Sequence, residues 1–110
     1  MTTWKLKRVV QCKKCPWRVD VDPHDIPNGY SETKHRALEE TIARQERGLM
    51  TPTPAIGCHE MHDAHCIGWL VNQLGPGNNI PLRIRMRSCE NFKSVKLRGE
   101  QHPTFEDTLP

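Results

Sequence analysis

The chain is organised around Cys58-His59-Glu60-Met61-His62-Asp63-Ala64-His65-Cys66-Ile67-Gly68-Trp69, a segment with two thiols and three imidazoles in its first nine residues. A second cysteine pair lies upstream in Cys12-Lys13-Lys14-Cys15 and is followed by Pro16 and Trp17. A C-x2-C turn combined with a second cluster of cysteine and histidine is the ligand pattern of a structural zinc site. The sequence therefore predicts two segments that are tied together through one metal ion.

Four cysteines are the predicted ligands of one structural Zn²⁺ ion, namely Cys12, Cys15, Cys58 and Cys66. His59 is the alternative to Cys58, because neighbouring residues of a strand face opposite ways and only one of them easily reaches the ion. His62 and His65 are further candidates outside this set. Two other interpretations stay open: an iron–sulfur cluster, which four cysteines also hold, and four buried reduced thiols without a metal.

Composition limits the chain to a single small domain. It has 110 residues, of which only 35% are hydrophobic, with nine prolines and seven glycines. Such a chain builds a small apolar core, for which a bound metal is a common remedy. It contains no apolar run of about 18 residues and no apolar signal segment, so we expect no membrane contact and a cytoplasmic location, with the cysteines reduced.

The hydrophobic pattern predicts an α+β fold with two main helices and short strands. The expected elements are a strand at 4–10, a helix at 31–47, a strand at 55–59 and a helix at 64–74. Ser31 and Asp63 are the predicted N-caps, and Gly48 and Gly75 are the predicted helix stops. We expect the zinc-binding domain to span residues 1–98, followed by a polar tail at 99–110.

Residues 80–87 carry two conflicting signals. Apolar and basic residues alternate as in a strand, whereas Asn79 and Pro81 resemble a helix start. A strand would align Arg83, Arg85 and Arg87 on one face, and a helix would spread them about 200° apart at successive odd positions. The pattern alone leaves both structures open.

The net charge of +3 conceals two basic segments around an acidic one. Residues 1–18 carry six bases and no acid, residues 83–98 carry six bases and one acid, and residues 19–82 carry nine acids and four bases. An anionic partner would meet the two basic segments. The candidate contact residues are Lys5, Lys7, Lys13, Lys14, Arg83, Arg85 and Arg87; the alternative is an ordinary solvated surface.

The motifs argue against catalysis. His59-Glu60-x-His62 is one residue short of the H-E-x-x-H zinc-protease motif, and Asp63 stands where the second histidine belongs. In zinc deaminases H-x-E precedes P-C-x-x-C, and here the order of the two parts is reversed. A pairing of Cys89 with a distant histidine is unspecific in a chain with five cysteines and six histidines. We therefore expect no enzyme and no small-molecule substrate, and keep a metal-dependent or cysteine enzyme as an alternative.

The set Cys12-x-x-Cys15-Pro16-Trp17-Arg18, Cys58-His59 and Cys66-x-Gly68-Trp69 resembles a family of small uncharacterised proteins from bacteriophages, prophages and some bacterial genomes. The resemblance covers residues 10–88 and implies a zinc-binding fold and a phage accessory context, but no activity. By analogy it suggests a role in host nucleic-acid metabolism or defence.

We therefore expect a non-catalytic accessory protein in the cytoplasm of the bacterial host. It would dock on a host protein and modulate it. The alternative is a zinc protein that binds nucleic acid through residues 1–18 and 83–98. With one Tyr and two Phe, the chain lacks the aromatic platform of single-strand binders.

Overall fold

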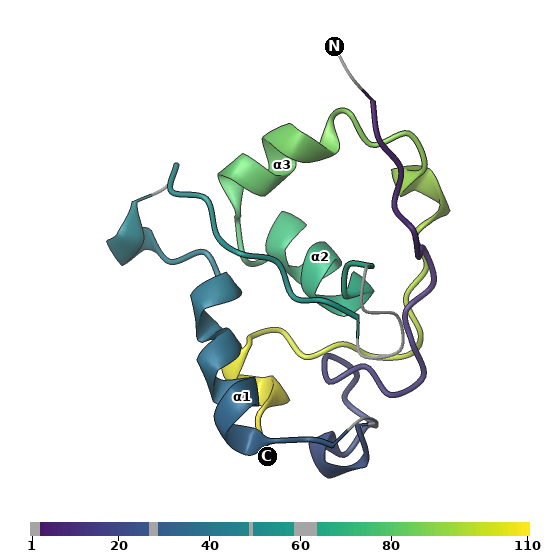
Figure 1. Cartoon of the computed structure of the whole chain (residues 1–110), viewed down its shortest axis with the longest axis vertical. Coiled ribbons are helices and arrows are strands. Elements are labelled where there is room, and N and C mark those ends of the chain that lie inside the picture. Colours follow the sequence, from purple (N-terminus) through teal and green to yellow (C-terminus); the bar gives the residue numbers. More distant parts are fainter. Residues whose placement is uncertain (1–2, 27–28, 49, 59–63) are drawn as a thin grey trace.

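Short helices joined by extended segments make up the chain in the computed structural model, which describes residues 3–26, 29–48, 50–58 and 64–110 (Figure 1). Within these residues lie three α-helices: α1 (Glu32–Ala37), α2 (Ile67–Leu74) and α3 (Ile80–Met86). The 3-10 helices there are η1 (Pro23–Asp25), η2 (Leu38–Thr41), η3 (Gln45–Arg47), η4 (Phe92–Ser94) and η5 (Glu106–Thr108). The protein is a small compact domain with few strand residues, and its α-helices number three where the sequence predicted two. No described helix is long and apolar enough to cross a membrane.

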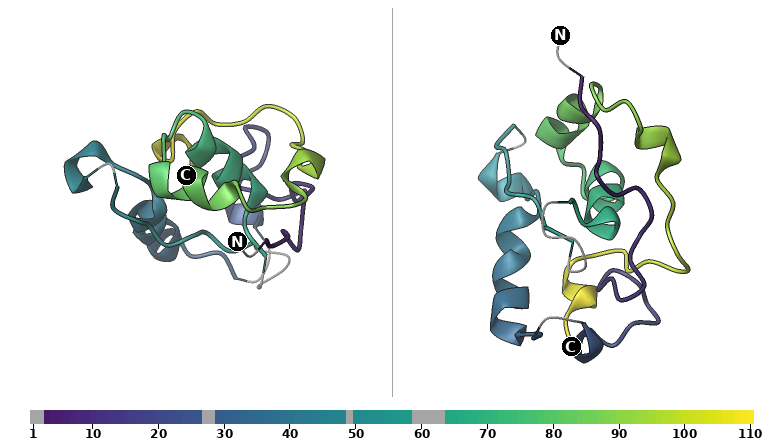
Figure 2. Two further views of the ribbon diagram at one scale, coloured as in Figure 1. Left: turned by 90° about the horizontal axis from the view of Figure 1, so that it is seen from above. Right: turned by 45° about the vertical axis from the view of Figure 1, so that its right-hand side comes forward.

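The two ends of the chain run side by side along one edge of the molecule (Figures 1 and 2). Parallel bridges join Trp4 to Cys89 and Val10 to Lys96, and an antiparallel bridge joins Arg18 to Gln101. The strand predicted at 4–10 is therefore reduced to isolated bridges. Burial nevertheless alternates as in a strand at 5–7, because Leu6 is buried while its neighbours at 5 and 7 are exposed.

Side-chain amides explain why the two ends pair without forming a regular sheet. The Leu6 N–H donates to Asn91 Oδ1 at 2.8 Å, and Asn91 Nδ2 donates back to the Leu6 carbonyl at 2.9 Å. Further along, the Arg98 N–H donates to Gln11 Oε1 at 2.8 Å. Each side chain takes the place of a backbone partner, which satisfies the buried peptide groups without a ladder.

The helix predicted at 31–47 is broken into three short pieces, α1, η2 and η3. Its predicted cap is confirmed, because Ser31 Oγ accepts from the Lys34 N–H at 3.4 Å. The chain leaves the helix at Ile42, and the Ala43 N–H donates to Gln73 Oε1 at 2.9 Å. This distant acceptor competes with the intrahelical one, so a partner 30 residues away ends the helix.

Helix α2 begins at Ile67, later than the predicted start at residue 64. The delay arises because the Cys66 N–H donates to the Ile56 carbonyl at 2.8 Å, which holds the preceding residues in a β bridge. The predicted cap Asp63 lies outside the described residues. The predicted end is confirmed, since Gly75 is the C-cap.

Residues 80–86 form a helix, α3, and the strand alternative is not formed. Asn79 Oδ1 accepts from the Leu82 N–H at 3.2 Å, and Pro81 lies in the first turn, where its missing N–H costs nothing. Leu82 and Met86 point into the core. The row of three arginines that a strand would have aligned is consequently absent.

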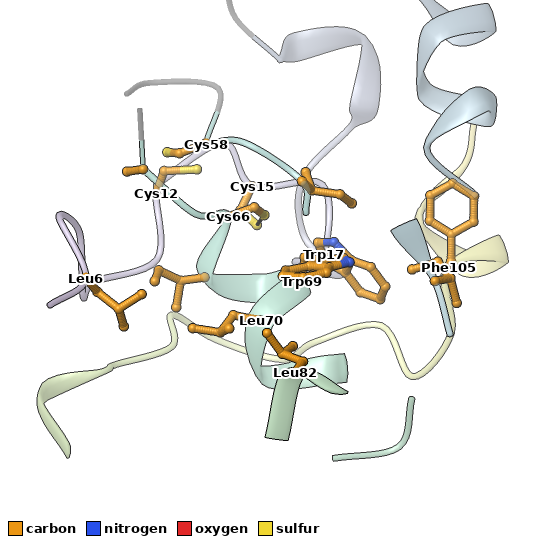
Figure 3. Close-up of a cluster of buried hydrophobic side chains, with 14 of the residues drawn as sticks. Leu6, Cys12, Cys15, Trp17, Cys58, Cys66, Trp69, Leu70, Leu82 and Phe105 are labelled. Atoms are coloured by element: carbon orange, nitrogen blue, oxygen red, sulfur yellow. Dashed lines mark hydrogen bonds between the residues drawn. The ribbon is translucent and has the colours of Figure 1, made fainter. Parts of the chain in front are cut away.

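The core gathers the two buried tryptophans, the four predicted ligand cysteines and the apolar faces of α2 and α3 (Figure 3). Trp17 lies 6.3 Å from Phe105 between ring centroids, and the Trp69 indole N–H donates to the Thr41 carbonyl at 3.1 Å. Residues 99–110, expected to be a polar tail, supply Phe105 and the buried Thr108 to this interior.

Candidate metal centre

The first half of the candidate centre is the turn that carries Cys12 and Cys15. The Cys15 N–H points to the Cys12 carbonyl at 3.4 Å, and the Arg18 N–H donates to the Cys15 carbonyl at 3.1 Å. Two successive turns thus fold the chain back on itself and carry both thiols into the buried interior. Lys13 and Lys14, between the cysteines, are exposed.

The second half is a small antiparallel pairing that leads into α2. Gly57 bridges His65, and the Cys58 N–H donates to the Ala64 carbonyl at 2.8 Å. Cys58 lies just after this bridge and Cys66 is the N-cap of α2, and both are buried. The predicted short strand at 55–59 is reduced to this isolated bridge at Gly57, and its last residue, His59, lies outside the described residues.

All four predicted ligand cysteines reach the same buried cluster, although they come from distant parts of the chain (Figure 3). Cys15 Sγ lies 3.7 Å from Cys66 Sγ. A disulfide would need about 2.05 Å between the sulfurs, and all five cysteines are free. Two thiolates on one tetrahedral zinc ion, each about 2.3 Å from it, would lie about 3.8 Å apart. The observed pair matches that spacing.

The electrostatics of Cys15 favour a neutral thiol in the protein without a bound cation. A hydrogen bond with Cys12 lowers the pKa of the Cys15 thiol, but the hydrogen bond with Cys66, burial and the negative charge of a Cys66 thiolate together raise it to about 12. Two adjacent buried thiolates repel each other unless a positive ion lies between them. A metal ion would supply that charge and release the protons.

Gly68 allows the two halves to meet. A Cβ atom there would lie 2.6 Å from Trp17 Cβ, 2.8 Å from Cys15 Sγ and 2.9 Å from Gln11 Nε2. Any side chain would therefore push α2 away from the cysteine turn. Gly68 belongs to the Cys66-x-Gly68-Trp69 motif, and its place two residues after Cys66 is the sequence signal for this close approach.

Only some of the predicted ligand candidates lie in the part of the chain that the structure describes. Among the described residues, no group of three or more His, Cys, Asp or Glu side chains is arranged to hold a metal ion. The candidates His59 and His62 fall in 59–63, outside this part of the chain. His65 is described and lies 5.9 Å from Trp4, ring to ring. Burial, and then the charge of Arg85, lower the pKa of the His65 imidazole. The four predicted ligand cysteines are all described, and they do not form such a group. Their thiols are donors that zinc prefers, and the sulfur atoms of Cys15 and Cys66 are at ligand spacing.

The basic residues singled out from the sequence have different surroundings. Lys5 lies 3.7 Å from Glu90, between its Nζ and a carboxylate oxygen, and the side chain of Lys7 is exposed but has a contact of its own. Arg83 donates to the Leu74 carbonyl at 3.0 Å and so caps the C-terminal end of α2. The guanidinium of Arg85 lies 5.0 Å from the centre of the Trp4 ring. The arginines of α3 therefore serve separate local contacts.

Comparisons of the chain with protein families, with curated proteins and with solved structures found no match.

Proposed function

We propose that this protein is a non-catalytic, phage-type accessory protein in the bacterial cytoplasm that docks on the acidic surface of a host protein and modulates it. A single structural Zn²⁺ ion held by Cys12, Cys15, Cys58 and Cys66 would stabilise the docking-competent fold. The metal would contribute folding energy and no chemistry, since four cysteine ligands leave no open coordination position.

The observation that carries this proposal is the pairing of the two basic segments. The bridges Trp4–Cys89 and Val10–Lys96 bring residues 3–18 alongside residues 87–98, although the two are far apart in the sequence. We call this surface the basic edge; its exposed lysines are Lys5, Lys7, Lys13, Lys14, Lys93 and Lys96. Charge gathered on one edge attracts an anionic partner and accelerates its association.

The acidic residues of the central segment lie away from the basic edge, which supports docking through that edge. Glu32, Glu39 and Glu40 belong to α1 and η2, which lie across the molecule from the basic edge in Figure 1. Exposed ion pairs such as Arg36–Glu32, 3.0 Å apart, neutralise part of that side. An anionic partner could therefore approach the basic edge without meeting the acidic region.

Exposed apolar residues next to the basic edge favour a protein partner over nucleic acid. Ile84, Phe92 and Leu97 are exposed by 48%, 37% and 40%, and all three lie among the bases of residues 83–98. Protein interfaces bury such residues at their centre and place charge around them, whereas a phosphate backbone offers them no partner. The proposed zinc ligands Cys12 and Cys15 belong to residues 3–18, one of the two segments that form this surface.

A pulldown from bacterial lysate, with and without nuclease, tests the proposal. The wild-type protein should retain a specific host protein after nuclease treatment, and Lys93→Glu with Lys96→Glu should abolish capture. The matched control is Lys34→Glu with Arg36→Glu, which makes the same charge change on α1 and should capture normally.

Loss of all capture after nuclease would favour the nucleic-acid alternative. In that case affinity for duplex DNA should fall with salt at a slope of about −0.9 for each phosphate neutralised. Equal loss of capture in both double variants would mean that net charge alone, and not the basic edge, governs binding.

A further inference from the structure

A groove of about 440 Å³ lies between the extended segment 52–55 and helix α3. Thr53 and Ala55 line one wall, Pro81 and Leu82 line the other, and Arg85 lies at the same groove. No acidic residue is among the described residues that line it. Its volume falls within the range of about 300–1,000 Å³ that is usual for ligand sites.

The wall formed by residues 52–55 has an unpaired backbone. No described residue hydrogen-bonds to the peptide groups of this segment; the side chain of Thr53 does make a polar contact, in which its Oγ1 accepts from Asn79 Nδ2 at 3.1 Å. Pro52 and Pro54 have no N–H, so in an extended course all donors belong to Thr53 and Ala55, two residues apart on one edge. Such an edge is suited to pair with another extended chain.

Arg85 supplies the positive charge of the groove. Its guanidinium carbon lies over the Trp4 ring, 5.0 Å from the ring centroid. Among the described residues no carboxylate forms an ion pair with it. A guanidinium can bind a carboxylate with two parallel hydrogen bonds.

We infer that this groove binds an extended acidic segment of the partner protein, with its main chain along Thr53 and Ala55 and a carboxylate on Arg85. The inference rests on the proposed function in taking the partner to be a protein. Trp4 belongs both to the Arg85 contact and to the bridge with Cys89, so the groove continues directly from the basic edge.

Competing occupants fit less well. An isolated phosphate or carboxylate would use Arg85 and leave the unpaired backbone of Thr53 and Ala55 without a partner. A nucleic-acid strand offers phosphates but has no alternating N–H and C=O groups for that backbone. An acidic peptide satisfies both features at once, since backbone pairing supplies affinity and the side-chain contact supplies selectivity.

The experiment uses three fluorescein-labelled octapeptides and the full zinc-loaded chain. The first peptide alternates valine and aspartate, the second has the same sequence with every amide N-methylated, and the third alternates valine and lysine. We expect the first to bind, the second to bind at least about tenfold more weakly, and the third not to bind, because the fully methylated backbone cannot donate and the lysine peptide is repelled. Amide resonances of Thr53 and Ala55 should shift with the first peptide.

The matched protein variants are Arg85→Gln and Arg87→Gln. Both remove one charge at the end of α3, but Arg87 follows the helix and does not line the groove. Arg85→Gln should weaken the acidic peptide by at least about tenfold, as expected for a charge-assisted hydrogen bond, and Arg87→Gln should change it by less than about twofold. Equal losses in both variants, unchanged binding of the N-methylated peptide, or unshifted Thr53 and Ala55 amides would each overturn the inference.

The outcome is separable from that of the proposed function. If host-protein capture depends on Lys93 and Lys96 but no peptide binds, the groove inference is wrong and the proposed function stands. If peptide binding passes these controls but no host protein is captured, the groove binds acidic peptides and the host-protein proposal is wrong. Displacement of the peptide by duplex DNA would identify the groove as part of a nucleic-acid surface and overturn the inference.

Discussion

The cysteine region and the α1 region of this domain are built in different ways. Most residues of 12–17, 56–58 and 64–70 are buried, and these segments approach so closely that Gly68 admits no side chain. Residues 31–48 form three short helical pieces whose exposed faces carry ion pairs, and they depend on Trp69 and Gln73 for the contacts that end η2. We therefore expect substitutions in the cysteine region to lower the free energy of unfolding more than substitutions in the α1 region.

Metal removal should produce the largest effect. If the four cysteines hold zinc, the purified protein should contain about one equivalent, and chelation should unfold it. Structural zinc sites contribute apparent binding free energies of about 10–16 kcal/mol, which equals or exceeds the total stability of a small domain. Circular dichroism and elemental analysis measure this outcome, and Cys66→Ser should reproduce it. A folded, reduced sample without metal would leave the reduced-thiol interpretation.

Gly68→Ala should be the next most damaging change. The added methyl group would overlap Trp17 Cβ, which belongs to a rigid part of its side chain, so we expect a loss of about 3 kcal/mol, at the upper end for overpacking.

Urea unfolding measures that loss, with Gly29→Ala as the matched control. At Gly29 nothing lies within 4 Å of an added Cβ, but φ is +78°, so the cost there is backbone strain of about 1–2 kcal/mol. A smaller loss at Gly68 than at Gly29 would show that α2 can move away from the cysteine turn.

Helix caps offer an intermediate test of the same contrast. Asn79 is buried and contacts Leu82, Thr53 and Gln73 through its amide, so Asn79→Ala should cost about 2–3 kcal/mol. Ser31 caps α1 through a single exposed 3.4 Å contact, and Ser31→Ala should cost about 0.5–1 kcal/mol. Asn79 caps α3, and its contact with Gln73 joins it to α2, the helix that Cys66 caps. Thermal unfolding compares this buried cap with the exposed cap of α1; a larger loss in Ser31→Ala would contradict the expectation.

Cys89→Ser should have the smallest effect. The Cys89 thiol is half-buried and donates to Asn91 Oδ1 at 3.4 Å, a contact that a serine hydroxyl also makes. We expect a change within about 1 kcal/mol and an unchanged zinc content. Loss of metal in this variant would mean that the ligand set is wrong.

Local signals in the sequence predicted the start of α1 and the end of α2 correctly. The Ser31 cap and the Gly75 stop are decided by neighbouring residues, and so is the Asn79–Pro81 helix start, which the alternating pattern of residues 80–87 obscured. The four cysteines that the motif spacing predicts as ligands are all buried, while their role as ligands stays a prediction. Interactions within about one helical turn of a residue can therefore be predicted from the sequence.

Long-range partners account for the differences. The break at Ile42 requires Gln73, the late start of α2 requires Ile56, and the missing sheet at the chain ends requires the side chains of Asn91 and Gln11. The spacing of apolar residues along the sequence carries no information about hydrogen bonds to residues far away in the chain. The arginines of α3 show the same limit, since Arg85 is directed by Trp4 from the other end of the chain.

The pairing of residues 4–18 with residues 89–101 also constrains how the chain folds during synthesis. Leu6 can form its hydrogen bond with Asn91 only after 85 further residues have been synthesised. Closing so long a loop is entropically costly, and contacts of this separation form late. The cysteine turn at 12–15 therefore meets Cys66 before residues 4–18 can pair with residues 89–101. Translation speed through residues 89–101 should influence the yield of native protein more than speed through α1.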